Sequence, residues 1–413
     1  MRTGIKIFII FLICYTGAAS AQDTLSIMYY NILNYSPSNT ANKNNLKGIV
    51  NYIHPDVFAV NEISNDTSAK HILQYVLNID SSHHYKKAAY TDGPDTDNML
   101  FYNSDKLSLA LQDTVQTDLR IIDEYLLYYN NSAYISQHDT AFLDFYIAHL
   151  KASQGYEQDR LGEIQKLENH WNEKPGRKNI FIGGDMNFYT ATEPGLVKLL
   201  DTGAYQMNDP LDSIADWHDS LTYAHLHTQS TRLRQFGGGA SGGLDDRFDF
   251  IFVSNDVMQG NNQVRYIPGT YKAFGNDGHH LNDSLTALPL DPEIPDSVTY
   301  ELYNMSDHLP VIMKVYLNFD ASLPRVETAS NNEPFVVFPN PSTGEFNLLL
   351  KNYNDEAEVV IYSLMGQEEQ QCRIVPVSNG ISSIQIKNLE SGVYFANIKI
   401  NNKYYSKKIV VIR

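Results

Sequence analysis

An aspartate and an asparagine, Asp185 and Asn187, follow a short apolar run that ends in two glycines. If the strand continued past the glycines, both side chains would point to the same side of the sheet. A carboxylate can bind a hard cation or accept a proton, and an amide can both donate and accept a hydrogen bond. The pair therefore suits a phosphate group and an attacking water. A turn at the end of the strand is the simpler alternative, because Gly, Asp and Asn all favour turns.

Further polar residues that can bind a metal or a phosphate lie at the ends of apolar runs. They are Asn31, Glu62, His149, Asp307 and His308. Each has a simpler explanation as a turn, a helix cap, a strand-end histidine or a loop before a strand. Together they indicate one crevice, because polar groups at the ends of several strands converge in sheet-rich α/β proteins.

The apolar periodicity between these residues predicts the elements that position them. Helical spacing of apolar residues is found within 46–53, 72–77 and 161–167. Strands are predicted at 25–30, 56–60, 98–102, 107–111, 125–129, 142–148, 248–253 and 311–317, in addition to the strand that leads to Asp185. Because strands and helices are mixed in this order, we expect a sheet-rich core with helices outside.

The motifs stand in an order that resembles the endonuclease/exonuclease/phosphatase superfamily. The matching motifs are Tyr30-Asn31, Val60-Asn61-Glu62, His149-Leu150, Gly184-Asp185-Met186-Asn187, Arg247-Phe248-Asp249-Phe250-Ile251 and Ser306-Asp307-His308-Leu309-Pro310-Val311. The resemblance covers about Leu25 to Leu317. It implies an α/β fold, a four-layer α/β/β/α sandwich, and hydrolysis of a phosphate ester.

The resemblance also implies a metal site and a phosphate site. Glu62 would be the main carboxylate ligand of Mg²⁺, with Mn²⁺ or Ca²⁺ as alternatives, and Asn31 and Asp307 would lie near it. These are the oxygen donors that a hard cation prefers. Asp185 and Asn187 would hold the phosphate and the nucleophilic water.

Two histidines complete the implied catalytic set. His308 would take the proton from the attacking water, and Asp249 would accept its other ring N–H and so fix its tautomer. His149 would contact the phosphate or act as general acid, oriented by Asp97. Since abasic-site endonucleases resemble this pattern with a tyrosine in place of His149, the histidine favours the deoxyribonuclease, sphingomyelinase or phosphatase branches.

The first 21 residues have the pattern of a secretory signal peptide: two basic residues, an apolar run and Ala19-Ser20-Ala21 as the cleavage site. Removal of Arg2 and Lys6 takes two positive charges from the formal net charge of −17 and leaves −19. This acidity argues against a broad electrostatic grip on nucleic acid, which needs clustered Lys and Arg. It suits an exported protein that gathers divalent cations.

The segment Gly237–Gly243 is rich in glycine, but no predicted strand precedes it and no predicted helix follows it. We therefore interpret it as a flexible surface loop rather than a nucleotide-binding loop. Arg232 and Arg234 before it are interpreted as solvated arginines, with phosphate contact as the alternative.

The C-terminal region has short alternating stretches separated by turns, which predicts a small β-sandwich. Pro339-Asn340-Pro341-Ser342-Thr343-Gly344 and Gly392-Val393-Tyr394 resemble the C-terminal sorting domain of type IX secretion in the Bacteroidetes. An accessory carbohydrate-binding domain is the alternative. The predicted organisation is a signal peptide (1–21), a catalytic domain (22–318), a linker (319–332) and a sorting domain (333–413).

These observations together predict a secreted metal-dependent phosphodiesterase, with extracellular DNA or RNA as the substrate. The alternatives are a phospholipid diesterase of the sphingomyelinase type, a phosphomonoesterase, and a surface protein that binds without catalysis. We expect the type IX secretion machinery as a partner, a monomer without stable membrane insertion, and export through the periplasm to the medium or the cell surface.

Overall fold

The computed structural model of the chain describes two stretches of residues. They are 23–317, except 81, 133–134, 136–139 and 202, and 335–412, except 341, 352–356, 364–367, 375–380 and 401–402. The predicted signal peptide (1–21) and linker (319–332) lie outside the described residues. None of the helices in the described stretches is long and apolar enough to cross a membrane.

Two mixed β-sheets form the centre of the first stretch. The first sheet contains β1 (Asp23–Tyr35), β2 (Val57–Ile63), β3 (Tyr85–Lys87), β4 (Asp97–Asn103), β11 (Val264–Tyr266), β12 (Lys272–Ala273) and β13 (Val311–Leu317). Its order is β11-β13-β1-β2-β4-β3, with β12 paired to β13. The second sheet contains β5 (Leu107–Val115), β6 (Ile122–Tyr129), β7 (Phe142–His149), β8 (Ile180–Asp185), β9 (Met207–Asn208) and β10 (Asp249–Ser254), in the order β5-β6-β7-β8-β10-β9.

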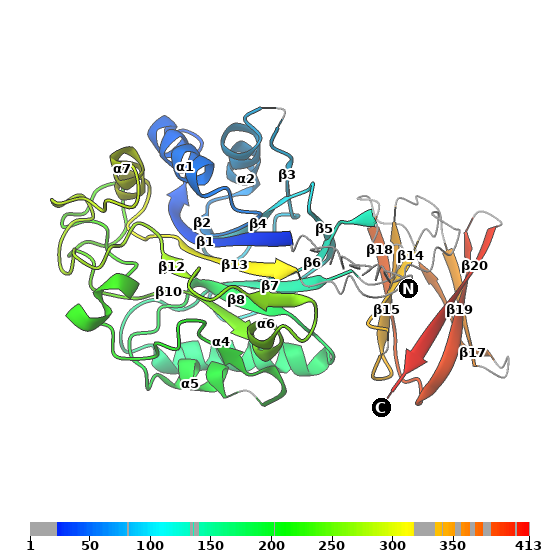
Figure 1. Ribbon diagram of the computed structural model, residues 1–413. Helices are drawn as coiled ribbons and strands as arrows, with labels where there is room; N and C mark the ends of the chain where they lie inside the picture. Colours follow the sequence, from blue (N-terminus) through cyan, green and yellow to red (C-terminus); the bar gives the residue numbers. More distant parts are fainter. Residues whose placement is uncertain are drawn as a thin grey trace, which may run out of the picture.

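Helices cover the outer face of each sheet (Figure 1). The helices over the first sheet are α1 (Thr40–Ile53), α2 (Asp66–Ile72), which continues as the π-helix η1 (Leu73–Leu77), and α7 (Asp296–Met305). Those on the side of the second sheet are α4 (Glu157–Glu173), α5 (Pro194–Leu200) and α6 (Asn255–Gln259). Two 3₁₀ turns are η2 (Gly203–Tyr205) and η3 (Leu221–Leu226). The layers therefore follow the order α/β/β/α, and the predicted four-layer sandwich is confirmed.

Alternation of side chains along the strands explains the two cores of this stack. In β8, Phe181 belongs to the core that lies between the sheets, whereas Ile182 belongs to the core under α4. Leu167 and Trp171 of α4 are fully buried against that second core. Successive strand residues point to opposite faces, so a strand buried on both faces reads as a continuous apolar run. This burial fixes the ends of β7 and β8 relative to each other.

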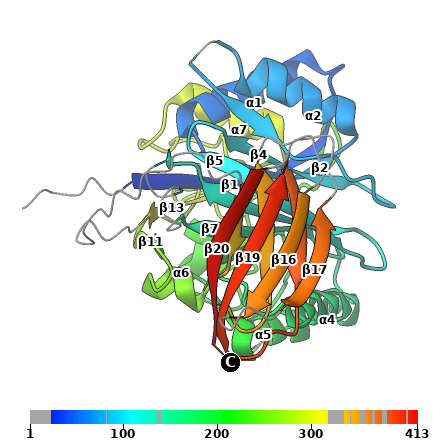
Figure 2. The ribbon, with the colours of Figure 1, turned by 90° about the vertical axis from the view of Figure 1, so that its right-hand side faces the viewer.

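The C-terminal stretch is a separate pair of antiparallel sheets, and Figure 2 shows one of them face on. The first sheet contains β14 (Phe335–Phe338), β15 (Phe346–Lys351) and β18 (Ile381–Ile386). The second contains β16 (Ala357–Ser363), β17 (Glu368–Ile374), β19 (Gly392–Ile400) and β20 (Lys403–Val411). Leu348, Val359 and Ile398 contribute to one shared core. The predicted β-sandwich is confirmed.

Candidate active site

Strand pairing places three of the predicted site residues at one level of the second sheet. β7 and β8 run parallel with His149 opposite Asp185, and β10 runs antiparallel to β8 with Asp249 also opposite Asp185. The side chains of His149 and Asp185 are 4% and 5% exposed, so both are buried. His149 Nε2 lies 3.3 Å from Asp185 Oδ2. The end of three adjacent strands therefore presents an imidazole and two carboxylates.

The first sheet supplies an amide and a carboxylate to the same place. β1 and β2 run parallel, and Asn31 and Glu62 lie near their carboxyl ends. Asn31 Nδ2 donates to Glu62 Oε1 at 2.9 Å and to Asp185 Oδ2 at 3.1 Å. The two sheets thus meet at one site through the side chain of Asn31.

Asn61 joins the two sheets beneath the site, a role that the sequence did not indicate although the residue lies in a matching motif. Its Oδ1 accepts from the backbone N–H of Asp185 at 3.0 Å, and its Nδ2 donates to Asn98 Oδ1 at 2.7 Å and to the carbonyl of Ala148 at 3.0 Å. Gly184 has φ 121°, and a Cβ there would lie 2.6 Å from Asn61 Oδ1. A glycine is therefore required at this position, since the two sheets approach closely.

The loop between α7 and β13 brings Asp307 and His308 to the site. His308 Nδ1 hydrogen-bonds to Asp249 Oδ2 at 2.7 Å, as predicted, and His308 Nε2 lies 3.6 Å from Asp185 Oδ2. Ser306 Oγ donates to the carbonyl of Asn31 at 2.7 Å and accepts from the N–H of His308 at 3.1 Å. This serine therefore fixes the loop to β1.

Gln229 is a site residue that the sequence reasoning missed. Its Nε2 lies 2.6 Å from His308 Nε2 and donates to Asp307 Oδ2 at 3.2 Å. It belongs to a polar segment between predicted elements, where neither apolar periodicity nor a motif marked it.

Four residues with left-handed backbone conformations cluster at these strand ends. They are Leu33 (φ 45°), Asn34 (φ 51°), Glu62 (φ 60°) and Asn187 (φ 51°). A positive φ is uncommon for residues other than glycine, and such residues gather at functional sites. In β2 this conformation accompanies a register shift between Val60 and Ile63, which points Glu62 towards Asn31.

The structure corrects two of the predictions about the site. The first is the strand through Asn187: β8 ends at Asp185, and Asn187 Nδ2 donates to the carbonyl of Leu150 at 3.3 Å. The second is the orientation of His149 by Asp97. Asp97 accepts hydrogen bonds from the hydroxyl of Tyr90 and from the N–H of Gly93, whereas His149 Nδ1 is buried without a hydrogen-bond partner among the described residues.

The two histidines have opposite electrostatic environments. Burial, with Arg120 and His308 nearby, lowers the pKa of His149 well below its usual value. Burial also acts to lower the pKa of His308, but Asp249, Asp185 and Asp307 outweigh it and raise the pKa well above its usual value. Three carboxylates thus favour a proton on His308, which is the protonation state opposite to that of a general base.

Burial also affects the carboxylates of the site. It raises the pKa values of Glu62 and Asp185, and the hydrogen bond from Asn31 acts in the opposite direction on both. The negative charges of Asp249 and Glu62 add to the increase at Asp185. Carboxylates gathered at this density need a positive partner to remain ionised together.

The donor set fits a divalent cation. Glu62, His149 and Asp185 each offer one ligand atom, and these atoms lie within 4.8 Å of one another, so this cluster shares only Glu62 with the predicted ligands Glu62, Asn31 and Asp307. One carboxylate oxygen of each of Asp185, Asp249 and Asp307 is buried without a hydrogen-bond partner among the described residues. Buried polar atoms are rarely left unpaired, and oxygen donors suit Mg²⁺, Mn²⁺ or Ca²⁺.

The glycine-rich loop and Arg232 also differ from our interpretation. The side chain of Arg232 is buried rather than solvated, because it donates to the carbonyls of Tyr303 (3.1 Å), Phe236 (2.9 Å) and Asn304 (3.3 Å). Arg234 is exposed, as expected. The loop that follows lies against Asp307, since the N–H of Ala240 donates to Asp307 Oδ2 at 2.6 Å.

The C-terminal domain matches a known family. Residues 336–412 match the family described as "Secretion system C-terminal sorting domain". The predicted type IX sorting domain is thereby confirmed over these residues. This domain indicates export, with the protein secreted or held at the cell surface. No curated protein matches the chain.

Several solved structures are similar to the chain. One is an endonuclease/exonuclease/phosphatase family protein from Bacteroides thetaiotaomicron, with 15% identity and a TM-score of 0.44, covering 73% of this chain and 98% of that one. Another is a mannosyl-6-phosphatase from the same species, with 16% identity and a TM-score of 0.44, covering 71% and 100%. A third is D. rerio TDP2 complexed with a single-strand DNA product, with 13% identity and a TM-score of 0.42, covering 71% and 98%.

Proposed function

We propose that the protein is a secreted, divalent-metal-dependent phosphoric ester hydrolase that acts on extracellular nucleic acid. The observation that carries the proposal is the convergence on Asp185. Asn31 Nδ2, His149 Nε2 and His308 Nε2 all lie within 3.6 Å of its Oδ2. Hydrolysis of a phosphate ester requires charge neutralisation, a deprotonated water and a protonated leaving group, and this set can provide all three.

Each residue has a role in the proposed mechanism. Glu62, with Asn31 and Asp307, would hold the cation. A bound cation would offset the carboxylate charge around His308 and stabilise the anionic phosphoryl oxygens. Asp185 and Asn187 position the phosphate and the attacking water.

Proton transfer is assigned to the two histidines. Asp249 holds the proton of His308 on Nδ1, so that the Nε2 lone pair accepts the proton of the water once the water takes the place of the Gln229 amide beside it. His149, whose Nε2 lies 3.3 Å from Asp185 Oδ2, contacts the phosphate or protonates the leaving group. This assignment requires His308 to be neutral before the water is activated.

Aromatic and basic residues beside His149 support nucleic acid as the substrate. Lys151 Nζ lies 3.8 Å from the centroid of the Tyr156 ring, and this tyrosine is 42% exposed. Tyr189, two residues after Asn187, packs against Phe248 with ring centroids 4.7 Å apart. Exposed rings can stack on bases, while nearby cations contact the phosphate backbone.

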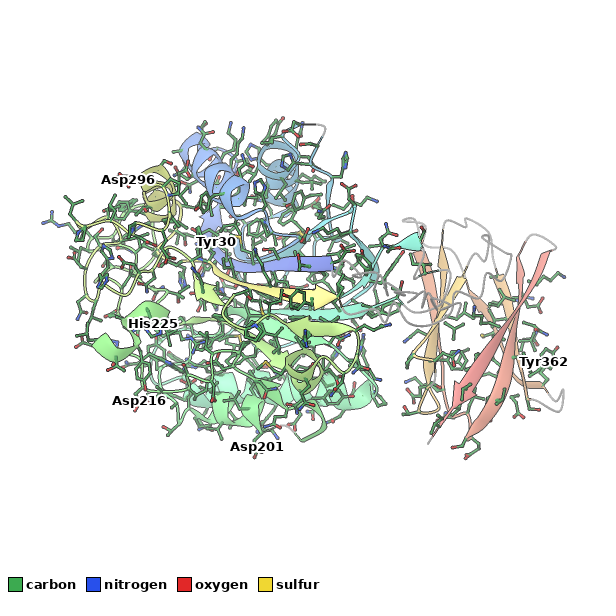
Figure 3. All side chains as sticks on the ribbon, viewed as in Figure 1. Tyr30, Asp201, Asp216, His225, Asp296 and Tyr362 are labelled. Atoms are coloured by element: carbon green, nitrogen blue, oxygen red, sulfur yellow. The ribbon has the colours of Figure 1, made fainter. Side chains whose placement is uncertain are left out.

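A phosphomonoesterase is the second candidate, and the charge of the surface favours it. Exposed carboxylates such as Asp201, Asp216 and Asp296 lie at the periphery of the catalytic domain (Figure 3). With a net charge of −17 before signal removal, the surface repels a long polyanion more than a small phosphate ester. The burial of His149, Asp185 and His308 agrees with a small substrate.

A substrate panel tests the proposal. Residues 22–413 would be assayed on DNA, RNA, sphingomyelin, inositol phosphates and sugar phosphates with Mg²⁺ or Mn²⁺, and again with a chelator. We expect metal-dependent cleavage of nucleic acid. If only sugar or inositol phosphates are cleaved, the protein is a phosphomonoesterase and not a nuclease. If no phosphate ester is hydrolysed, both proposed functions are refuted.

A further inference from the structure

We propose that the glycine-rich loop 237–243 is a positioning element of the active site, which holds the carboxylate of Asp307 so that its second oxygen faces a divalent cation. The inference rests on the proposed function, because it deepens the role of one metal ligand. It assigns a function to a segment that lies outside all the motifs named in the sequence analysis.

The carboxylate of Asp307 is held at one oxygen only. Its Oδ2 accepts from the N–H of Ala240 at 2.6 Å and from Gln229 Nε2 at 3.2 Å. Its Oδ1 is buried without a hydrogen-bond partner among the described residues, and the whole residue is 2% exposed. Two neutral donors thus fix the orientation of the carboxylate, while the other oxygen keeps its full capacity to bind a cation.

Hydrogen bonds to the preceding residues fix the conformation of the loop. The N–H groups of Gly242 and Gly243 donate to the carbonyl of Arg232 at 2.9 and 3.0 Å. Ser230 Oγ donates to the carbonyl of Ala240 at 3.2 Å. The buried guanidinium of Arg232 also lies 3.9 Å from the centroid of the Phe236 ring. These contacts set the position of the Ala240 N–H with respect to Asp307.

Gly239 marks the point where the loop touches the carboxylate. A Cβ added there would lie 2.5 Å from Cγ of Asp307, closer than real Cβ contacts allow. At Gly237 a Cβ would meet nothing within 4 Å. Both glycines have left-handed backbones, with φ of 79° and 66°. Alanine therefore introduces the same kind of backbone strain at the two positions, but only at position 239 does it displace Asp307.

This pair of glycines gives a matched experiment. Binding of Mn²⁺ to residues 22–413 would be measured by calorimetry without substrate for the wild type, Gly239→Ala and Gly237→Ala. We expect the affinity of Gly239→Ala to fall at least tenfold, while Gly237→Ala stays within about twofold of the wild type. Equal losses in the two variants, or wild-type affinity in Gly239→Ala, would overturn the inference.

A second variant tests the inference in case Gly239→Ala does not fold. Gln229→Ala removes the other donor to Asp307 without adding atoms, and we expect it to weaken Mn²⁺ binding as well and to lower kcat more than it changes KM. Unchanged affinity in this variant would count against the inference even if Gly239→Ala failed to fold. Because binding is measured without turnover, an inactive wild type that binds Mn²⁺ would remove only the proposed hydrolase activity.

Discussion

The hydrogen bond between Asp249 and His308 gives the sharpest prediction. Asp249→Asn keeps the volume of the side chain and removes its charge. The bond is 2.7 Å long, and the side chains of both residues are at most 4% exposed, so solvent screens it little. A hydrogen bond to a charged group contributes about 1.5–3 kcal/mol. If this energy orients His308 in the transition state, kcat should fall about 10- to 150-fold, since 1.36 kcal/mol corresponds to a factor of ten.

A double-mutant cycle tests the reasoning behind this number. His308→Ala should lower kcat by about 10²–10⁴-fold, the usual contribution of a general acid or base. Because Asp249 is expected to act through His308, adding Asp249→Asn to His308→Ala should change kcat little further. The assay is the steady-state cleavage of whichever phosphate ester the substrate panel identifies, at saturating Mg²⁺.

Stability measurements separate this effect from unfolding. The charge of Asp249 repels Asp185, whose pKa it raises, but attracts His308, whose pKa it also raises, so its removal should change the melting temperature only by the difference between these opposing effects. Asp144→Asn is a suitable control, because Asp144 is fully buried in β7 but lies opposite Ile180, at the other end of β8 from Asp185. A wild-type kcat in Asp249→Asn, or a double mutant whose losses simply multiply, would refute the assigned roles.

Three further predictions address the metal, a buried carboxylate and export. Chelation should abolish hydrolysis and lower the melting temperature, with Mg²⁺ or Mn²⁺ restoring both, because a cation that binds only the folded state stabilises it; a chelator without effect on either would contradict the metal site. Burial raises the pKa of Asp123 from 3.8 to about 7. Between these pH values the folded state keeps a proton that the unfolded state releases, so the free energy of unfolding falls as pH rises from about 4 to about 7. Asp123→Asn should therefore stabilise the fold at pH 8 by up to about 4 kcal/mol and change little at pH 4, as measured by urea unfolding at the two pH values; an equal effect at both would contradict the burial cost. Deletion of residues 333–413 should leave catalysis intact and retain the protein in the periplasm, as fractionation of the native host would detect; normal secretion of the truncated chain would contradict the sorting role.

Strand ends are the part of the site that the sequence reveals best. Asn31, His149 and Asp185 each end an apolar run, and parallel pairing of β1 with β2 and of β7 with β8 brings such ends to one edge. The position of Asp249 opposite Asp185 follows from one antiparallel pair. Local patterns predict these residues because the backbone ladder converts position along a strand into position in space.

Contacts made by loops were not predictable in the same way. Arg232 is buried because it donates hydrogen bonds to three backbone carbonyls, and no local pattern in the sequence indicates those partners. Gln229 reaches His308 across 79 positions of the chain. The misassigned role of Asp97 has the same origin, because a resemblance in sequence identifies a residue type without its hydrogen-bond partners, Tyr90 and Gly93.

Two kinds of costly feature occur together where the two sheets meet. A residue other than glycine in a left-handed conformation costs about 1–3 kcal/mol, as does a buried polar atom without a partner. Leu33, Asn34 and Glu62 show the first feature, and the carboxylates of Asp185 and Asp307 show the second. Burial of the aromatic residues in the two cores can offset these costs. Core packing does not explain, however, why the left-handed residues and the unpaired carboxylate oxygens occur at the same place. A ligand that pairs with the free carboxylate oxygens does give a reason, since it recovers in the bound state what the protein loses without it.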